Sequence, residues 1–87
     1  IMNIDLTKIL ANASTGLKLY STLHGEVLFQ YIHYFRSEVV VKAFTRDGGF
    51  GYIRFQKDGR YFKSFPGECV LFPSKDNRDW TNINISQ

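Results

Sequence analysis

The amino-acid sequence predicts a mainly β fold: a small antiparallel barrel of about five to six strands with a short N-terminal helix. Five short apolar runs are separated by glycine-containing turns, and aromatic residues make up 16% of the 87 residues. Runs of this length and composition are typical of strands. Because a chain of this size builds only one modest core, we expect a single domain over residues 4–80 and a flexible tail over residues 81–87.

The first element is expected to be a short helix that covers one side of the barrel. Leu6, Ile9, Leu10 and Ala13 follow helical spacing, and Asp5 can accept a hydrogen bond at the N-cap position. After a polar break, Leu17, Leu19, Ser21 and Leu23 alternate with more polar residues, which predicts the first strand.

Three longer strands are predicted over residues 26–35, 38–44 and 50–57. The first of them loses its alternation near residues 31–34, which indicates a β-bulge or a sharp bend. The second has the β-branched content of a strand that is partly covered on both faces. A turn at Asp47, Gly48 and Gly49 joins it to the third, because glycine adopts the positive φ angles that tight turns need.

The dipeptide of Asp58 and Gly59 predicts a type I′ hairpin turn of two residues, which fixes the register of the strands beside it. In this register Phe55 lies opposite Phe62, and the two sides of the hairpin differ in character. The core side carries Ile53, Phe55 and Phe62, and the opposite side carries Phe50, Tyr52, Arg54, Gln56, Tyr61 and Lys63.

The last strand is predicted over residues 68–72 and ends at Pro73, which has no N–H to donate. A polar turn over residues 74–80 is expected to form one helical turn and to place Trp80 against the open end of the barrel. Strands of this number and length are typical of an SH3-like or similar small barrel. The predicted core consists of Leu6, Ile9, Leu10, Leu19, Val27, Phe29, Val39, Val41, Ile53, Phe55, Phe62, Val70 and Phe72.

Composition favours some functional classes over others. The net charge of +3 favours anionic partners, without the dense basic runs of dedicated nucleic-acid binders. The single cysteine, Cys69, excludes an internal disulfide, and no apolar stretch is long enough to span a membrane, so we expect a cytoplasmic protein. His24, His33 and Cys69 lack the spacing of a catalytic or metal site, so we expect no enzyme activity, no metal and no cofactor.

The first candidate site is the polar and aromatic side of the predicted hairpin. The sequence GFGYIRF at residues 49–55 resembles the RNP1 strand of RNA-recognition and cold-shock domains, although Gly48 stands where that pattern has Lys or Arg. Aromatic rings beside positive charge suit single-stranded nucleic acid. The alternative is an ordinary aromatic strand that the helix or tail partly covers. The candidate binding face consists of Phe50, Tyr52, Arg54, Tyr61 and Lys63.

A second candidate site lies near the end of the chain. The sequence LFPSKDNRDW at residues 71–80, with the glycine-tyrosine pattern at residues 58–61, resembles a group of small uncharacterised proteins of gut Bacteroidetes and their phages. This resemblance spans most of residues 4–80, implies a phage or mobile-element setting and transfers no catalytic residue. Trp80 can seal the barrel; alternatively, Lys75, Arg78 and Trp80 form a corner that binds a partner, because Trp and Arg are favoured at binding hot spots.

We therefore expect a non-enzymatic protein interaction module with an unknown protein partner. The alternative function is single-stranded nucleic-acid binding through the aromatic and basic strand face. The strands predicted over residues 26–35 and 38–44 are long enough to leave a free edge, and such an edge often pairs in a homodimer.

Overall fold

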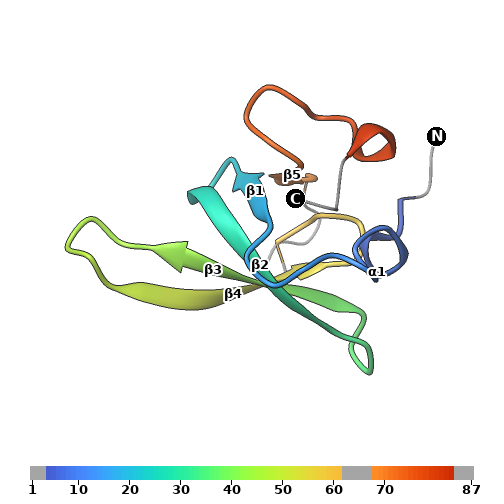
Figure 1. The fold of residues 1–87 in the computed structure, drawn as a ribbon, viewed down its shortest axis with the longest axis horizontal. Helices are drawn as coiled ribbons and strands as arrows, with labels where there is room; N and C mark the ends of the chain where they lie inside the picture. The colour runs from blue at the N-terminus through green and yellow to red at the C-terminus, as the bar shows by residue number, and fades with distance from the viewer. Residues whose placement is uncertain (1–3, 62–67, 84–87) are drawn as a thin grey trace.

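A computed structural model describes residues 4–61 and 68–83. The fold is mainly β, with one small helix and a five-stranded antiparallel sheet of order β4-β3-β2-β1-β5 (Figure 1). The predicted β class is therefore confirmed, whereas the named strands form an open sheet, so closure into a barrel is not confirmed. The elements are α1 (Leu6–Ile9), β1 (Lys18–Ser21), β2 (Gly25–His33), β3 (Glu38–Phe44), β4 (Phe50–Gln56), β5 (Leu71–Phe72) and the 3-10 helix η1 (Trp80–Asn82).

Helix α1 begins where the sequence predicts. The Asp5 carboxylate accepts a hydrogen bond of 3.0 Å from the Thr7 backbone N–H, which confirms the predicted N-cap. The Leu6 N–H donates to the Lys57 carbonyl over 2.7 Å, and this bond ties the helix to the turn that follows β4. The helix is a single turn, and its stability comes from burying Leu6 and Leu10 rather than from its own hydrogen bonds.

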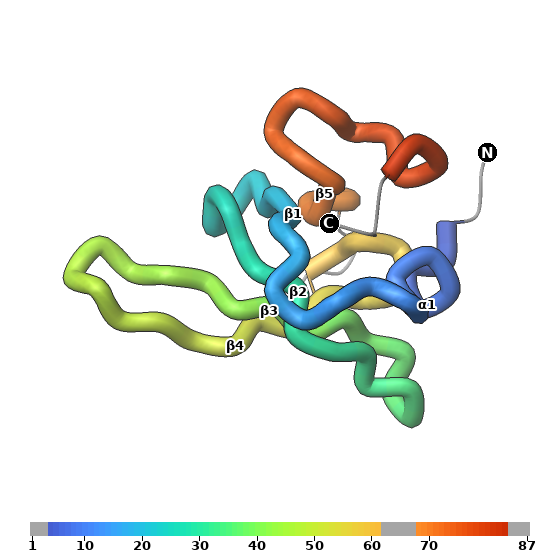
Figure 2. The backbone as a smooth tube through the Cα atoms, viewed as in Figure 1, coloured from blue at the N-terminus to red at the C-terminus, as the bar shows by residue number. Residues whose placement is uncertain are grey.

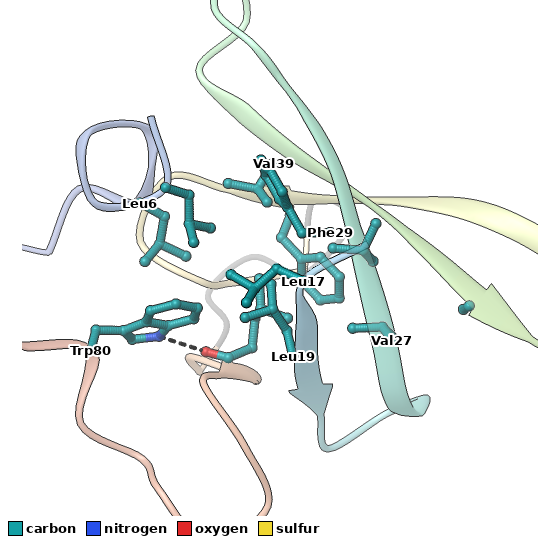
Figure 3. Close-up of a cluster of buried hydrophobic side chains, with 12 residues drawn as sticks. Leu6, Leu17, Leu19, Val27, Phe29, Val39 and Trp80 are labelled. Carbon is teal, nitrogen blue, oxygen red and sulfur yellow. Dashed lines mark hydrogen bonds between the residues drawn. The ribbon is translucent and has the colours of Figure 1, made fainter. Parts of the chain in front are cut away.

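The core lies between the inner face of the sheet, α1 and the C-terminal segment, and Figure 3 shows its members converging from these elements. Trp80 closes it: the side chain is 2% exposed, and its indole N–H donates a hydrogen bond of 2.9 Å to the Leu71 carbonyl (Figure 3). The buried cluster comprises Leu6, Leu10, Leu17, Leu19, Val27, Phe29, Val39, Val41, Ala43, Phe55, Leu71 and Trp80.

Two predictions about the central strands are confirmed. The predicted irregularity in β2 is present but begins earlier than residues 31–34, because the β2–β3 register shifts between Phe29 and Tyr31. Val39, Val40 and Val41 are all buried, so β3 is covered on both faces along this stretch.

The predicted register of the hairpin after β4 is wrong by one residue. Gln56 pairs with Arg60 through an N–H to carbonyl bond of 2.8 Å, and Gly59 donates to the Gln56 carbonyl over 2.9 Å. Gly59 has a φ of +87°, whereas Asp58 is not among the described residues with positive φ, as a type I′ turn would require. The loop is a three-residue turn with a glycine bulge, and it places Tyr61 opposite Phe55.

The last strand also differs from its prediction. Leu71, which the predicted core omitted, is fully buried, whereas Phe72 is half-buried and Val70 is half-buried and packs against the core. The reason is the partner strand: Leu71 pairs with Ser21, whose side chain faces the core. The predicted helical turn lies at Trp80–Asn82 rather than within residues 74–80. The predicted core residue Phe62 lies outside the described residues.

Candidate binding face

The outer face of the β3–β4 hairpin carries a group of exposed aromatic side chains. Phe44 is 51% exposed, Phe50 is 55% exposed and Tyr52 is 59% exposed. The register places Phe44 opposite Phe50 and Lys42 opposite Tyr52, so all four side chains lie on the same face. We call this group, Lys42, Phe44, Phe50 and Tyr52, the aromatic hairpin face. It lies on the part of the hairpin that extends away from α1 and the C-terminal segment (Figures 1 and 2).

The side chains of this face contact one another. The Lys42 ammonium group lies 4.0 Å from the centroid of the Phe50 ring and 5.8 Å from that of Phe44. The Phe50 and Tyr52 rings meet edge to face, with centroids 5.9 Å apart. Cation–π and edge-to-face contacts restrict side-chain rotation. The face is therefore partly organised before any partner binds.

Arg54 is the next residue on the same side of β4. Its guanidinium lies 3.8 Å from the Glu38 carboxylate, and the Glu38 side chain is only 14% exposed. The Oε1 atom of Glu38 is buried and has no hydrogen-bond partner among the described residues. A buried carboxylate oxygen without a hydrogen bond interacts strongly with the nearest cation, so part of the positive charge of Arg54 is compensated within the chain.

Two of the five predicted face residues are not placed beside Phe50 and Tyr52. Tyr61 lies on the core side, where its ring packs against Phe55 at a centroid distance of 6.1 Å and against His24 at 5.9 Å. This correction follows from the one-residue error in the turn, because a register slip of one moves a side chain to the opposite face. Lys63 lies outside the described residues.

The sequence-based prediction omitted Lys42 and Phe44. A usable signal was present in the sequence, because residues 46–48 and residues 57–59 share the order basic residue, Asp, Gly, and both segments form the same kind of turn. Gly48 has a φ of +88° and donates to the Thr45 carbonyl over 3.3 Å, and Thr45 donates to the Gly49 carbonyl over 2.9 Å. A three-residue turn at this point would have placed Phe44 opposite Phe50.

Only two of the three residues of the second candidate site are exposed at the surface. Trp80 is buried and contributes to the core, so it does not extend the exposed corner. Arg78 is exposed, and its guanidinium lies 4.6 Å from the Phe72 ring centroid and 5.7 Å from that of Tyr20. Lys75 is exposed at the rim of an open depression that β1 residues and Pro73 also line. The corner thus presents two cations, one of which already covers aromatic rings.

Three further large aromatic residues are exposed: Tyr31 lies within β2 and is 53% exposed, and the other two lie in the turn after β2, at the opposite end of β3. Phe35 is 94% exposed and Tyr34 is 65% exposed. The aromatic hairpin face does not include them, so they offer a comparison site for exposed aromatic surface.

Burial shifts the pKa values of two titratable side chains that the sequence singles out, His24 and Cys69. The His24 Nδ1 atom lies 3.1 Å from the Ser21 hydroxyl, and burial holds the pKa of this imidazole below its usual value. Burial raises the pKa of the Cys69 thiol, so little thiolate forms near neutral pH. Residues 4–61 and 68–83 contain no cluster of three or more His, Cys, Asp or Glu side chains that could hold a metal ion.

In comparisons with known proteins, no family model, no curated protein and no solved structure matches this chain. In the described part of the chain, no helix has the length and apolar character needed to cross a membrane.

Proposed function

We propose that this protein is a non-enzymatic protein interaction module that binds its partner through the aromatic hairpin face. One observation supports this proposal above the others: Phe44, Phe50 and Tyr52 are each more than half exposed on neighbouring positions of one hairpin. Adjacent exposed aromatic residues are unusual on a surface without a binding role and are favoured at interface hot spots.

The balance of charge favours a protein partner over nucleic acid. The aromatic rings are accompanied by Lys42, which lies over Phe50, and by Arg54, which is ion-paired with Glu38. Tyr61, which the nucleic-acid prediction needed, faces the core. Nucleic-acid affinity depends on cations that neutralise phosphates, and the described part of this face offers few for that purpose.

We also propose that the protein forms a small barrel and acts in a phage or mobile-element system. Isolated bridges link Phe55 to Tyr61 and Arg60 to Cys69, and so connect the end of β4 with the segment before β5. Together with the strand order, these bridges support an SH3-like or similar small barrel. The resemblance at residues 71–80 supports a phage or mobile-element system, in a cytoplasmic setting.

The test is affinity capture from cells that carry the gene, with quantitative mass spectrometry of what each variant retains. The double variant Phe50→Ser, Tyr52→Ser removes the face, and Phe35→Ser is the matched control because it removes an exposed aromatic ring elsewhere. We expect a protein that the wild type and the control retain equally and that the double variant retains at least about tenfold less, as for hot-spot loss. Equal retention by all three proteins would contradict the proposal.

Single-stranded nucleic-acid binding is the second candidate function, and the position of Lys42 over Phe50 favours it, because a cation beside exposed rings suits a base and its phosphate. Fluorescence anisotropy with labelled single-stranded RNA and DNA, at low and moderate salt, separates the two candidates. Micromolar binding that weakens with salt, and loses about 1–3 kcal/mol in Tyr52→Ala, would favour this candidate. The protein-binding proposal expects no association at concentrations near ~100 μM.

A further inference from the structure

We propose that the edge of β1, where it extends past the end of β5, is a binding site for an acidic peptide in extended conformation. The site lies at the opposite end of the sheet from β4, so it is separate from the aromatic hairpin face and does not depend on the proposed function. Figure 1 shows β5 and the segment that follows it beside β1.

The first observation is the direction of the backbone groups of Lys18. On the β5 side of β1, the Thr22 N–H donates to the Val70 carbonyl over 2.9 Å. On the β2 side, the Leu17 carbonyl accepts from the Phe29 N–H over 2.8 Å. Consecutive residues of an antiparallel strand direct their N–H and C=O groups to alternate sides. Those of Lys18, like those of Thr22, therefore face the β5 side.

Strand β5 ends before it reaches Lys18. The last pair of the ladder is Tyr20 with Phe72. Ser74 would come next, opposite Lys18, but its N–H donates to the Asn77 carbonyl over 3.2 Å, so the chain turns away from the sheet. Among the described residues, none bonds to the N–H and C=O groups that Lys18 directs to this side. A strand edge of this kind is a template for an added peptide strand.

An open depression of about 380 Å³ lies between β1 and the turn after β5. Its lining comes from residues 18–20 of β1, from Glu26 of β2 and from residues 73–75, all of them in the described part of the chain. Depressions of this size are large enough to hold a small ligand or part of a peptide. A segment added opposite Lys18 would enter this depression.

The charge around the depression is mainly positive. Lys18 and Lys75 line it, and the Arg78 guanidinium lies 5.7 Å from the ring centroid of Tyr20, which also lines it. Glu26 is the one acidic residue of the lining. All three cations are exposed, and none of them forms an ion pair within residues 4–61 and 68–83. Uncompensated cations beside an open strand edge favour an acidic peptide.

Two aspartates lie in the same turn, outside the lining of the depression. Asp79 accepts hydrogen bonds from the N–H and the hydroxyl group of Thr81, at 2.9 and 2.6 Å. Asp76 forms no ion pair with the described residues. Neither carboxylate is paired with one of the three cations, so the cations stay available to a partner.

The register decides which peptide side chains meet the cations. A peptide residue opposite Lys18 exchanges two main-chain hydrogen bonds with it and directs its side chain to the same face as the Lys18 side chain. Every second residue of the peptide shares that face. Glutamate at these positions therefore satisfies both the strand edge and the charge. Because the open edge is one residue long, we expect weak binding, with a dissociation constant between ~0.1 and ~1 mM.

The test is an NMR titration of the isotope-labelled full chain with a capped hexapeptide that alternates valine and glutamate. We expect saturable shifts of the amide signals of Lys18 and of residues 74–78. The same peptide with glutamine in place of glutamate should bind at least about fivefold more weakly. Equal binding of the two peptides, or an unchanged signal at Lys18, overturns the proposal.

N-methylated peptides separate strand addition from attraction by charge alone. Methylation of the glutamate nitrogens removes the N–H groups that face β1, whereas methylation of the valine nitrogens removes N–H groups that face away from it. The first peptide should bind at least about tenfold more weakly than the second. Equal affinities would show that the peptide does not add as a strand, and the proposal would fail.

Charge-reversal variants locate the site on the molecule. Lys18→Glu and Lys75→Glu should each weaken binding of the valine–glutamate peptide at least about fivefold. Lys8→Glu is the matched control, because it makes the same change of charge at an exposed lysine of α1. Urea unfolding checks that each variant is folded. Equal effects of all three variants, or a thymidine decanucleotide that shifts the same signals at lower concentration than the peptide, would contradict the proposal.

Discussion

The backbone of Gly59 passes so close to Cys69 that a Cβ atom at residue 59 would lie 2.6 Å from the Cys69 Sγ atom. The same glycine has a φ of +87° and accepts hydrogen bonds from the N–H groups of Val70 and Leu71, at 2.9 and 3.1 Å. One residue thus joins the turn after β4 to the segment that enters β5, and two separate requirements make it a glycine.

The first prediction separates these two requirements by comparing Gly59→Ala with Gly48→Ala. Both glycines end the same type of turn with nearly the same φ, but an added Cβ at Gly48 meets nothing within 4 Å. Gly48→Ala should cost about 1–2 kcal/mol for the left-handed backbone alone. Gly59→Ala should cost a further ~1–3 kcal/mol for overpacking, as measured by urea unfolding.

A double-mutant cycle tests the steric cause. Cys69→Ala removes the Sγ atom that the new Cβ would meet, so adding it to Gly59→Ala should recover part of the lost free energy of unfolding. If the two substitutions simply add, the contact between residues 59 and 69 is not the source of the extra cost.

The second prediction concerns Trp80. Trp80→Ala should destabilise the protein by about 3–5 kcal/mol, because it empties a buried site and removes the hydrogen bond to the Leu71 carbonyl. Trp80→Phe keeps most of the apolar volume and should cost less, about 1–3 kcal/mol, for the lost hydrogen bond to the Leu71 carbonyl and the smaller ring. Far-ultraviolet circular dichroism in urea measures both variants. Equal losses would show that volume contributes little.

The third prediction is a loss of stability in mildly acidic solution. Burial lowers the pKa of His24 below the usual 6.5, so the unfolded chain binds a proton at this residue more readily than the folded one. Above pH 6.5 His24 is neutral in both states and does not reduce the free energy of unfolding. This free energy should decline as the pH falls from 6.5 to the lowered pKa of His24 in the folded state. Urea unfolding at pH 7.5 and at pH values near ~5 measures the decline, and His24→Gln should reduce it.

A separate window lies at lower pH. Hydrogen bonds from Thr7 to Asp5 and from Thr81 to Asp79 lower the pKa of each carboxyl below 3.8. The stability from these carboxylates is present above pH 3.8 and is lost as the pH falls through their lowered pKa values. The His24 effect is therefore measured without interference from them.

The fourth prediction is that the aromatic hairpin face contributes little to folding. Phe50 and Tyr52 are more than half exposed, so the double variant Phe50→Ser, Tyr52→Ser should change the free energy of unfolding by about 1 kcal/mol or less. Ile53 is the next residue after Tyr52, lies on the inner face and packs against the core. Ile53→Ser should therefore cost about 2 kcal/mol or more. A large loss in the double variant would assign these rings to structure rather than to binding.

Patterns that span many residues were predictable from sequence. The alternation in β4 correctly separates the buried Phe55 from the exposed Tyr52, and the broken alternation in β2 correctly indicates the bulge. Helix α1 was identified by Asp5 and its apolar spacing. In each case several side chains pack on the same buried surface, so several residues carry the same periodic signal and no single residue decides the prediction.

Predictions that depend on one residue failed. An aspartate followed by glycine suits both the two-residue and the three-residue hairpin turn, and the choice between them moves Tyr61 from the binding face to the core side. The two-residue strand β5 is too short to show alternation, so only its pairing with Ser21 reveals that Leu71 faces inward. Trp80 illustrates the remaining limit, because sequence alone left it between a buried plug and a binding residue.

The pairing of β5 with β1 has a consequence for synthesis on the ribosome. Ser21 emerges early and Leu71 and Trp80 emerge late, yet they meet in one core. Until residue 80 leaves the exit tunnel, the edge of β1 that β5 later covers stays open and α1 lacks the indole that completes its side of the core. Contacts between distant residues also form slowly. The nascent chain therefore passes through a stage in which an unpaired strand edge is exposed to aggregation, and a chaperone that binds extended segments would shorten that risk.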